Sequence, residues 1–184
     1  GACAKVIETT PNKGFIQSVE TTSDLLQFAR DFGYQLLSTQ EVALDEDIVA
    51  KIDPQSSTIS NETWFLQSGL RLSGSDKAPL ALIETFVSPL FRPYWQDLSH
   101  RSPPFYSFLE ESTGVEITTI EQDIQALSMP QRVRQNLGHP STDLSLRVLR
   151  RYKASGRTVL ASFNWHLGEE SFIISSTLSH KRHD

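Results

Sequence analysis

The chain has 184 residues, and 38% of them are hydrophobic, which suits a single domain with a sizeable core. With 17 basic against 22 acidic residues the net charge is −5, so the chain lacks the positive surface that neutralises nucleic-acid phosphates. The single cysteine, Cys3, excludes an internal disulfide and a cysteine-based zinc site. No apolar run approaches the roughly 20 residues of a membrane span, and the N-terminus has no signal-peptide core, so we expect a soluble, cytoplasmic protein.

The first part of the chain predicts short elements separated by polar loops. Residues 15–19 predict a strand. Thr21 and Thr22 open a predicted helix, because a Thr followed three residues later by an acidic residue is typical of a helix start. Gly33 predicts the end of that helix. Residues 34–44 predict an extended segment, and Asp45 opens a short helix predicted over 45–52.

The segment 63–87 predicts a β-hairpin, because apolar and polar residues alternate on both sides of the turn-forming run GSDKAP. This hairpin places Arg71 and Glu84 on paired strands, and we expect them to share one face of the sheet. Either they form a surface ion pair, worth under about 1 kcal/mol, or they line a small-molecule pocket. The second interpretation follows because a buried charge is costly unless it has a partner or a ligand.

The second half of the chain predicts two further helices, over 105–112 and 129–137, which Gly114 and Gly138 end. Strands are predicted over 115–127, 144–153, 158–167 and 171–179. We expect the last three strands to form an antiparallel meander, which gives an α+β class. Within the middle one, Ser162, Asn164 and His166 share one face, which either contacts water or lines a pocket.

The chain lacks the sequence signatures of the common catalytic sites. There is no nucleophile elbow and no glycine-rich phosphate loop, and the five histidines show no HxxxH or HExxH spacing. We therefore expect no cofactor, no metal and no hydrolase activity.

Several segments together resemble a known family. They are GLRL before the hairpin turn, PLALIETFV after it, PPFYSFLEESTGVEI, LRVLRRYKASGR and the two final strands. Their order and spacing resemble the UTRA domain, the effector-binding half of HutC-type regulators in the GntR family, from about Gly14 to Ser179. The resemblance implies an α+β fold like that of chorismate lyase, with an antiparallel sheet, helices packed on one face and a buried ligand pocket.

The resemblance also implies how the whole regulator is organised. Residues 14–180 would form the effector-binding domain and 181–184 a tail, while 1–13 would be the remnant of the wing of an N-terminal winged-helix DNA-binding domain. It implies a homodimer that binds a small-molecule effector. Operator DNA would be contacted through the upstream domain and not through this segment, and no membrane partner is implied.

The resemblance assigns ligand-binding roles to individual residues. Arg71 matches the second Arg of the family's Arg-x-Arg, and Glu84 matches the acid on the return strand. The resemblance also implies Thr21, Thr22, Tyr106, Ser162, Asn164 and His166. We expect Tyr152 as an alternative to Tyr106 for stacking on the ligand. Gly69 stands where the first Arg would be, and Pro104 replaces the Ser of Ser-x-Tyr, which removes two anion ligands. We therefore expect a small carboxylate or ring-bearing metabolite, bound bidentately by Arg71 and stacked on a tyrosine, and not a sugar phosphate.

Three functions remain open at this point. The first is a non-enzymatic, ligand-sensing domain of a bacterial transcription regulator, which we expect. The second is an enzyme of the chorismate-lyase type, which needs two basic residues around a dicarboxylate and is disfavoured by Gly69. The third is a dimerisation module whose pocket is filled by side chains.

Overall fold

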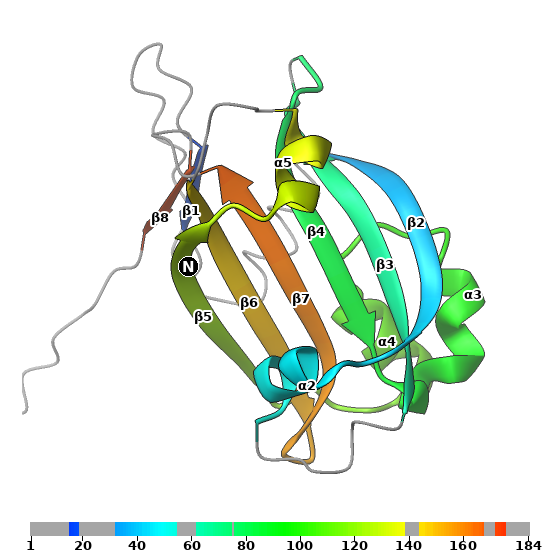
Figure 1. Ribbon diagram of the computed structural model, residues 1–184. Helices are drawn as coiled ribbons and strands as arrows, with labels where there is room; N and C mark the ends of the chain where they lie inside the picture. The colour runs from blue at the N-terminus through cyan, green and yellow to red at the C-terminus, as the bar shows by residue number, and fades with distance from the viewer. Residues whose placement is uncertain are drawn as a thin grey trace, which may run out of the picture.

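The computed structural model describes residues 15–18, 32–54, 62–74, 76–138, 144–167 and 172–175 (Figure 1). Six strands form its central sheet: β2 (Gly33–Ala43), β3 (Thr63–Leu72), β4 (Pro79–Val87), β5 (Thr119–Ser128), β6 (Leu144–Ala154) and β7 (Arg157–Leu167). Within the described residues, five helical elements accompany the sheet: α2 (Glu46–Ile52), the 3₁₀ helix η2 (Pro89–Tyr94), α3 (Trp95–Leu98), α4 (Tyr106–Thr113) and α5 (Gln131–Leu137). The order β2-β3-β4-β7-β6-β5 is antiparallel throughout, which confirms the α+β class.

The predicted hairpin is confirmed as β3 and β4. Leu70 lies opposite Leu82 and Leu66 opposite Phe86, so the alternating leucines meet on one face of the sheet. The side chain of Asp76 stabilises the turn by accepting a hydrogen bond from the backbone N–H of Ala78 at 3.1 Å.

The short helices α2, α4 and α5 begin and end within two residues of their predicted bounds. Asp45 caps α2, since its carboxylate accepts a hydrogen bond from the backbone N–H of Ile48 at 2.7 Å. Gly114 and Gly138 end α4 and α5 in the left-handed conformation, with φ of 70° and 71°. The helix predicted from Thr21 lies outside the described residues.

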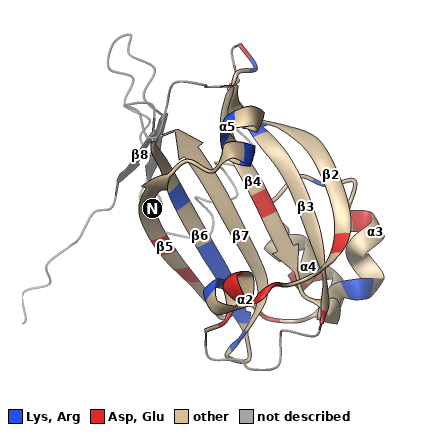
Figure 2. Cartoon of the chain, in the orientation of Figure 1, with Lys and Arg blue, Asp and Glu red and all other residues tan. Residues whose placement is uncertain are grey.

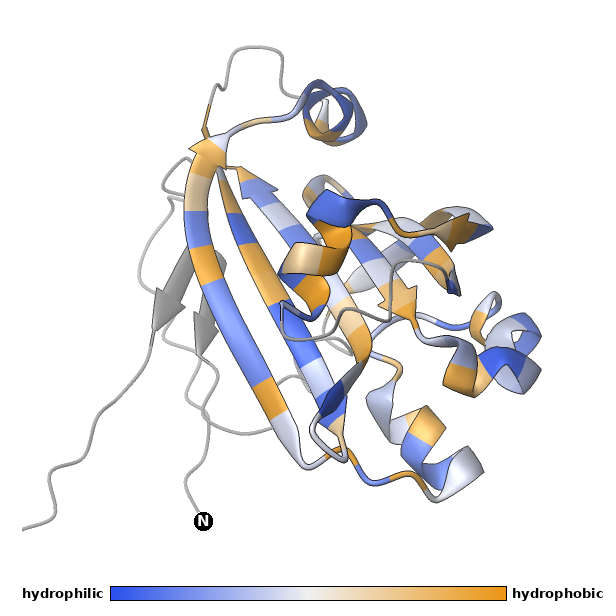
Figure 3. Cartoon of the chain, turned by 60° about the horizontal axis from the view of Figure 1, so that its bottom comes forward, coloured by the Kyte–Doolittle hydropathy of each residue, from blue (hydrophilic) through white to orange (hydrophobic). Residues whose placement is uncertain are grey.

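Hydrophobic clusters cover both faces of the sheet. One face, here called the α5 face, packs against α2 and α5; its buried members include Ile52, Leu82, Phe86, Val133 and Phe163. The other, the α4 face, packs against η2, α3 and α4; its buried members include Phe65, Val87, Phe91, Leu109 and Leu160. The described helices therefore lie on both faces, not on one as the resemblance implied (Figure 1). Figure 3 shows the alternation of hydrophobic and hydrophilic residues along the strands that makes two faces possible.

The closing strands differ from the predicted meander. β6 and β7 pair through a tight turn as expected, but the next strand, β8 (Phe172–Ser175), pairs in parallel with β1 (Phe15–Ser18) in a separate sheet. β7 instead has β4 as its second neighbour, and β5 forms the edge beyond β6. The expectation of a three-stranded meander is therefore wrong.

None of the helices in the described ranges is long and apolar enough to cross a membrane.

Candidate functional site

Polar side chains form a continuous line across the α4 face. Cross-strand pairing aligns one polar residue from each of the six strands, and directly opposed residues share a face. We call this set the polar row; its members are Thr39, Gln67, Thr85, Ser162, Arg150 and Gln122. The four central members are at most 7% exposed. The hydroxyl of Thr85 is fully buried and has no hydrogen-bond partner among the described residues. A buried row of this kind is costly unless its groups are paired, so it marks the α4 face as a candidate site.

Arg71 lies on the same face, four residues along β3 from Gln67. Its side chain is buried, and Nη2 donates a hydrogen bond to the carbonyl of Pro103 at 3.1 Å. Burial lowers the pKa of Arg71 to about 10, and the nearby Tyr34 opposes that change. The guanidinium is therefore still a cation at neutral pH, held inside the domain.

Two neighbouring side chains fix the surroundings of this guanidinium. The ring of Tyr34 faces it, with 5.6 Å between the guanidinium carbon and the ring centroid. The Tyr34 hydroxyl donates to Oε1 of Gln67 at 2.9 Å. Gln67 Nε2 in turn donates to the carbonyls of Leu98 and Arg101, at 2.9 and 3.2 Å. Arg71 and Gln67 thus both bind the segment that leads from α3 to α4.

The structure leaves no room for a side chain at Gly69. A Cβ at this position would lie 2.3 Å from the Cζ and hydroxyl of Tyr34 and 2.7 Å from the carbonyl of Gln35. Tyr34 therefore occupies the space above Gly69 that a side chain from β3 would need. Burial raises the pKa of Tyr34, so its hydroxyl stays neutral.

An aromatic pair borders the polar row on the side of α4. The rings of Tyr106 and Tyr152 stack with 5.5 Å between their centroids. The side chains of Tyr152 and Ser162 are hydrogen-bonded, and burial raises the pKa of Tyr152. Asn164 Nδ2 donates to Ser162 Oγ at 3.1 Å and to the carbonyl of Val148 at 3.2 Å. These bonds orient the polar groups of β7 within the sheet.

Two further buried residues of the same face, His166 and Arg150, are titratable. Burial, followed by the positive charge of Arg150, lowers the pKa of His166 to about 3. His166 is therefore a neutral imidazole at physiological pH. Arg150 is also buried, which lowers its pKa, and its Nε donates to Oε1 of Gln122 at 2.8 Å.

The structure brings most of the predicted ligand-binding residues together. Six of them share the α4 face: Arg71, Tyr106, Tyr152, Ser162, Asn164 and His166. Thr21 and Thr22 lie outside the described residues. Glu84 lies on the α5 face instead, where its carboxylate accepts hydrogen bonds from Trp165 Nε1 at 2.9 Å and Arg132 Nη2 at 3.0 Å. The expectation that Glu84 shares a face with Arg71 is wrong, because Arg71 pairs with Ala81 and Glu84 is three residues farther along β4.

Reasoning from the sequence missed four residues of this face: Tyr34, Gln67, Thr85 and Arg150. Each lies at a strand position whose side chain belongs to the α4 face, but only the order of the strands shows that the four residues lie on the same face. The alternation of Gln67 with the leucines of β3 was the available signal.

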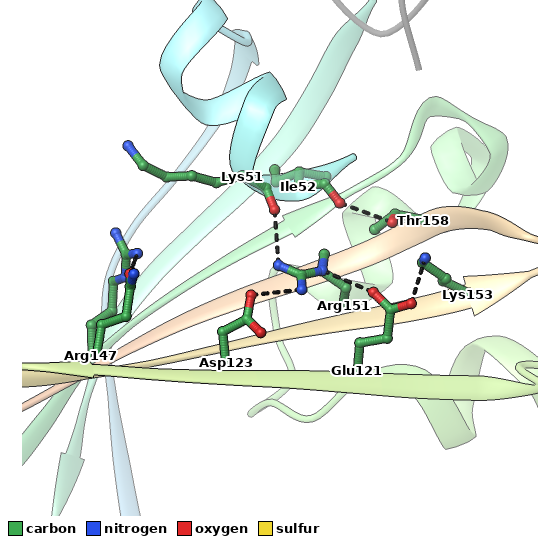
Figure 4. Close-up of polar contacts among 9 residues, drawn as sticks. Lys51, Ile52, Glu121, Asp123, Arg147, Arg151, Lys153 and Thr158 are labelled. Atoms are coloured by element: carbon green, nitrogen blue, oxygen red, sulfur yellow. Dashed lines mark hydrogen bonds and ion pairs between the residues drawn. The ribbon is translucent and has the colours of Figure 1, made fainter. Parts of the chain in front are cut away.

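The charged groups on the α5 face mostly neutralise one another. Figure 2 shows an acidic residue on β4 close to the basic residues of α5. At the β5–β6 edge, Arg151 contacts Glu121 at 3.1 Å, Asp123 at 2.6 Å and the carbonyl of Lys51 at 3.1 Å (Figure 4). Lys153 pairs with the other oxygen of Glu121 at 2.6 Å, and these two cations lower the pKa of Glu121. This cluster joins α2 to the sheet and is not the candidate site.

Within the described residues, no group of three or more His, Cys, Asp or Glu side chains could hold a metal ion.

Known proteins share this architecture. A GntR-family transcriptional regulator from Bacillus cereus superposes with a TM-score of 0.64 at 18% identity, over 81% of this chain and 99% of that one. The effector domain of PhnF from Mycobacterium smegmatis gives a TM-score of 0.70 at 11% identity, over 90% of this chain and all of the other. A longer structure of PhnF from the same organism gives a TM-score of 0.70 at 12% identity, over 91% and 73% of the two chains. A search of curated protein sequences gave no match. The family model of the UTRA domain matches residues 30–171, most of the chain, and the chain therefore belongs to the UTRA domain family.

Proposed function

We propose that this chain is the effector-sensing domain of a bacterial transcription regulator of the GntR family, of the HutC type, and that its ligand binds on the α4 face. The carrying observation is the buried polar row together with Arg71 on the same face. Membership in the UTRA family and the likeness to GntR-family effector domains support a regulatory and non-catalytic role. An upstream winged-helix domain would contact operator DNA, and the regulator would act as a homodimer.

The effector is a small carboxylate or a related metabolite. Arg71 supplies a buried cation whose planar guanidinium matches a carboxylate. Tyr34 fills the position beside Arg71 with a neutral ring, so the site offers one cation there and not a pair. The stacked tyrosines Tyr106 and Tyr152 supply an aromatic wall for an apolar or ring-bearing part.

Signalling follows from the contacts of Arg71 and Gln67 with the segment between α3 and α4. A ligand shifts a regulator only by binding one arrangement more tightly than another. A carboxylate on Arg71 competes with the carbonyl of Pro103 for the guanidinium, so ligand binding changes how this segment is held. The conformation of α4 is thereby coupled to occupancy.

A thermal-shift screen of carboxylates, amino-acid derivatives and sugar phosphates tests this function, because a ligand selective for the folded state raises the melting temperature. We expect carboxylates to raise it and Arg71→Gln to abolish the shift. Arg132→Gln, a variant on the opposite face, should keep the shift. Tight binding of a sugar phosphate, or an undiminished shift with Arg71→Gln, contradicts the proposal. Release of 4-hydroxybenzoate from chorismate in a spectrophotometric assay would instead identify an enzyme.

A further inference from the structure

The α4 face carries a second buried guanidinium, that of Arg150. It belongs to the polar row on β6, while Arg71 lies on β3, with β4 and β7 between them. Arg71 pairs with Ala81 of β4, and Arg150 aligns with Thr85 of β4 through Ser162. Ala81 and Thr85 are four residues apart. Strand geometry then separates their backbones by about 13 Å along the strands and about 14 Å across them. Arg71 contacts Tyr34 on β2, and Arg150 bonds to Gln122 on β5, the strands on the outer sides of β3 and β6. One small anionic group therefore does not contact both guanidinium groups.

The groups between the two arginines are neutral hydrogen-bonding side chains. Thr85 and Ser162 lie between Gln67 and Arg150 in the polar row, and Asn164 and His166 follow on β7. The hydrogen bond from Arg150 Nε to Gln122 Oε1 fixes the plane of the guanidinium from the side of β5. The charge of Arg150 also lowers the pKa of His166, and His166 aligns with Arg71 through Ala81 of β4. Arg150 is thus electrostatically coupled to the part of the face that Arg71 occupies.

We propose that Arg150 forms a second anion subsite, so that the effector carries two acidic groups, one on Arg71 and one on Arg150, joined by a linker that contacts Thr85 and Ser162. A buried cation is most stable with an anion beside it, and a ligand with two acids meets both cations while its linker meets the hydroxyls. This inference rests on the proposed sensing function and narrows the ligand class to dicarboxylates.

Calorimetric titration of the chain with glutarate, adipate, pimelate and suberate, and with the monomethyl ester of each, tests the second subsite over a series of increasing length. We expect at least one diacid to bind about tenfold or more tightly than its monoester, since the ester removes one charge-assisted contact. Arg150→Gln should reduce that preference to about one. Arg151→Gln is the matched control, because it removes an adjacent arginine whose side chain lies on the α5 face, and it should keep the preference.

Two results overturn the inference, and they differ in what they say of the proposed function. If diacids and monoesters bind equally well and both depend on Arg71, the second subsite is wrong while carboxylate sensing stands. If no acid in either series binds, the second subsite and the proposed effector class are both wrong. The comparison of diacid and ester on the unaltered chain decides the matter even where Arg150→Gln does not fold.

Discussion

The ring of Tyr34 on β2 lies directly over Gly69 on β3, so close that a Cβ at position 69 would be 2.3 Å from the ring. The same tyrosine bonds to Gln67 and faces the guanidinium of Arg71. The glycine and the tyrosine therefore form one unit, in which the missing side chain on β3 makes room for an aromatic one from the neighbouring strand. This unit places a neutral ring beside Arg71 in the candidate site.

Gly69→Ala should destabilise the domain by about 1–3 kcal/mol, because the new methyl group overlaps both Tyr34 and the backbone carbonyl of Gln35. Urea unfolding measures the change. Gly33→Ala is a matched control in the paired strand, since its Cβ would meet Leu72 at an ordinary 3.4 Å, and it should be tolerated. Equal destabilisation by the two alanines would show that the Tyr34–Gly69 contact is not the cause.

The stability of the domain should fall as the pH decreases from about 6.5 toward 3, because of His166. Its pKa in the folded state is about 3, below the ordinary 6.5, so over this range the unfolded chain binds a proton that the folded chain does not. The free energy of unfolding should therefore fall by up to about 1.4 kcal/mol per pH unit from this residue.

Urea unfolding between pH 5 and 6.5, where most carboxylates stay ionised, isolates this effect. His166→Gln should flatten the profile, because it removes the group whose pKa differs between the folded and unfolded states. A profile of equal slope in the His166 variant would mean that this imidazole is accessible to protons in the folded domain.

Glu84 should matter for stability and not for ligand binding, because it lies on the α5 face. Glu84→Ala leaves the buried indole N–H of Trp165 without its acceptor and should cost about 1–3 kcal/mol. Glu84→Gln keeps an acceptor and loses only the ion pair with the half-exposed Arg132, which should cost about 1 kcal/mol or less. Denaturation and calorimetry on both variants check this. A tenfold loss of carboxylate affinity in Glu84→Gln would place the residue in the site after all.

Thr85→Val should raise stability and weaken binding at the same time. The Thr85 hydroxyl is buried with no partner among the described residues, so a similarly shaped apolar side chain should raise the free energy of unfolding by about 1 kcal/mol. The same change removes a hydrogen-bonding group from the centre of the polar row, which should weaken carboxylate binding. A variant that gains stability and keeps full affinity would exclude Thr85 from the ligand contacts.

The sequence predicted local structure well because local chemistry determines it. The caps at Asp45, Gly114 and Gly138 and the turn between β3 and β4 depend on residues a few positions apart. The prediction that Arg71 and Glu84 share a face was wrong. Which residues share a face depends on the register across the turn, and this register shifts between Arg71 and Leu72.

The polar row could not be predicted, because it depends on the order of strands in the sheet. β7 lies between β4 and β6, although more than 60 residues separate β4 from β7 in the chain. Ser162 thus meets Thr85 and Arg150, a contact that no local pattern encodes. The predicted meander gave β7 the strand β8 as its second neighbour, whereas the structure has β4 there. This error also arose because the order of strands is not a local property.

Calorimetric titration of the tightest-binding carboxylate into the unaltered chain and into Arg71→Gln tests the central claim most directly. If Arg71 holds the carboxylate from inside the α4 face, the variant should bind about 10- to 100-fold more weakly, the effect of one charge-assisted hydrogen-bonded contact, while Arg132→Gln on the opposite face binds normally. Affinity of Arg71→Gln within twofold of the unaltered chain would contradict the account.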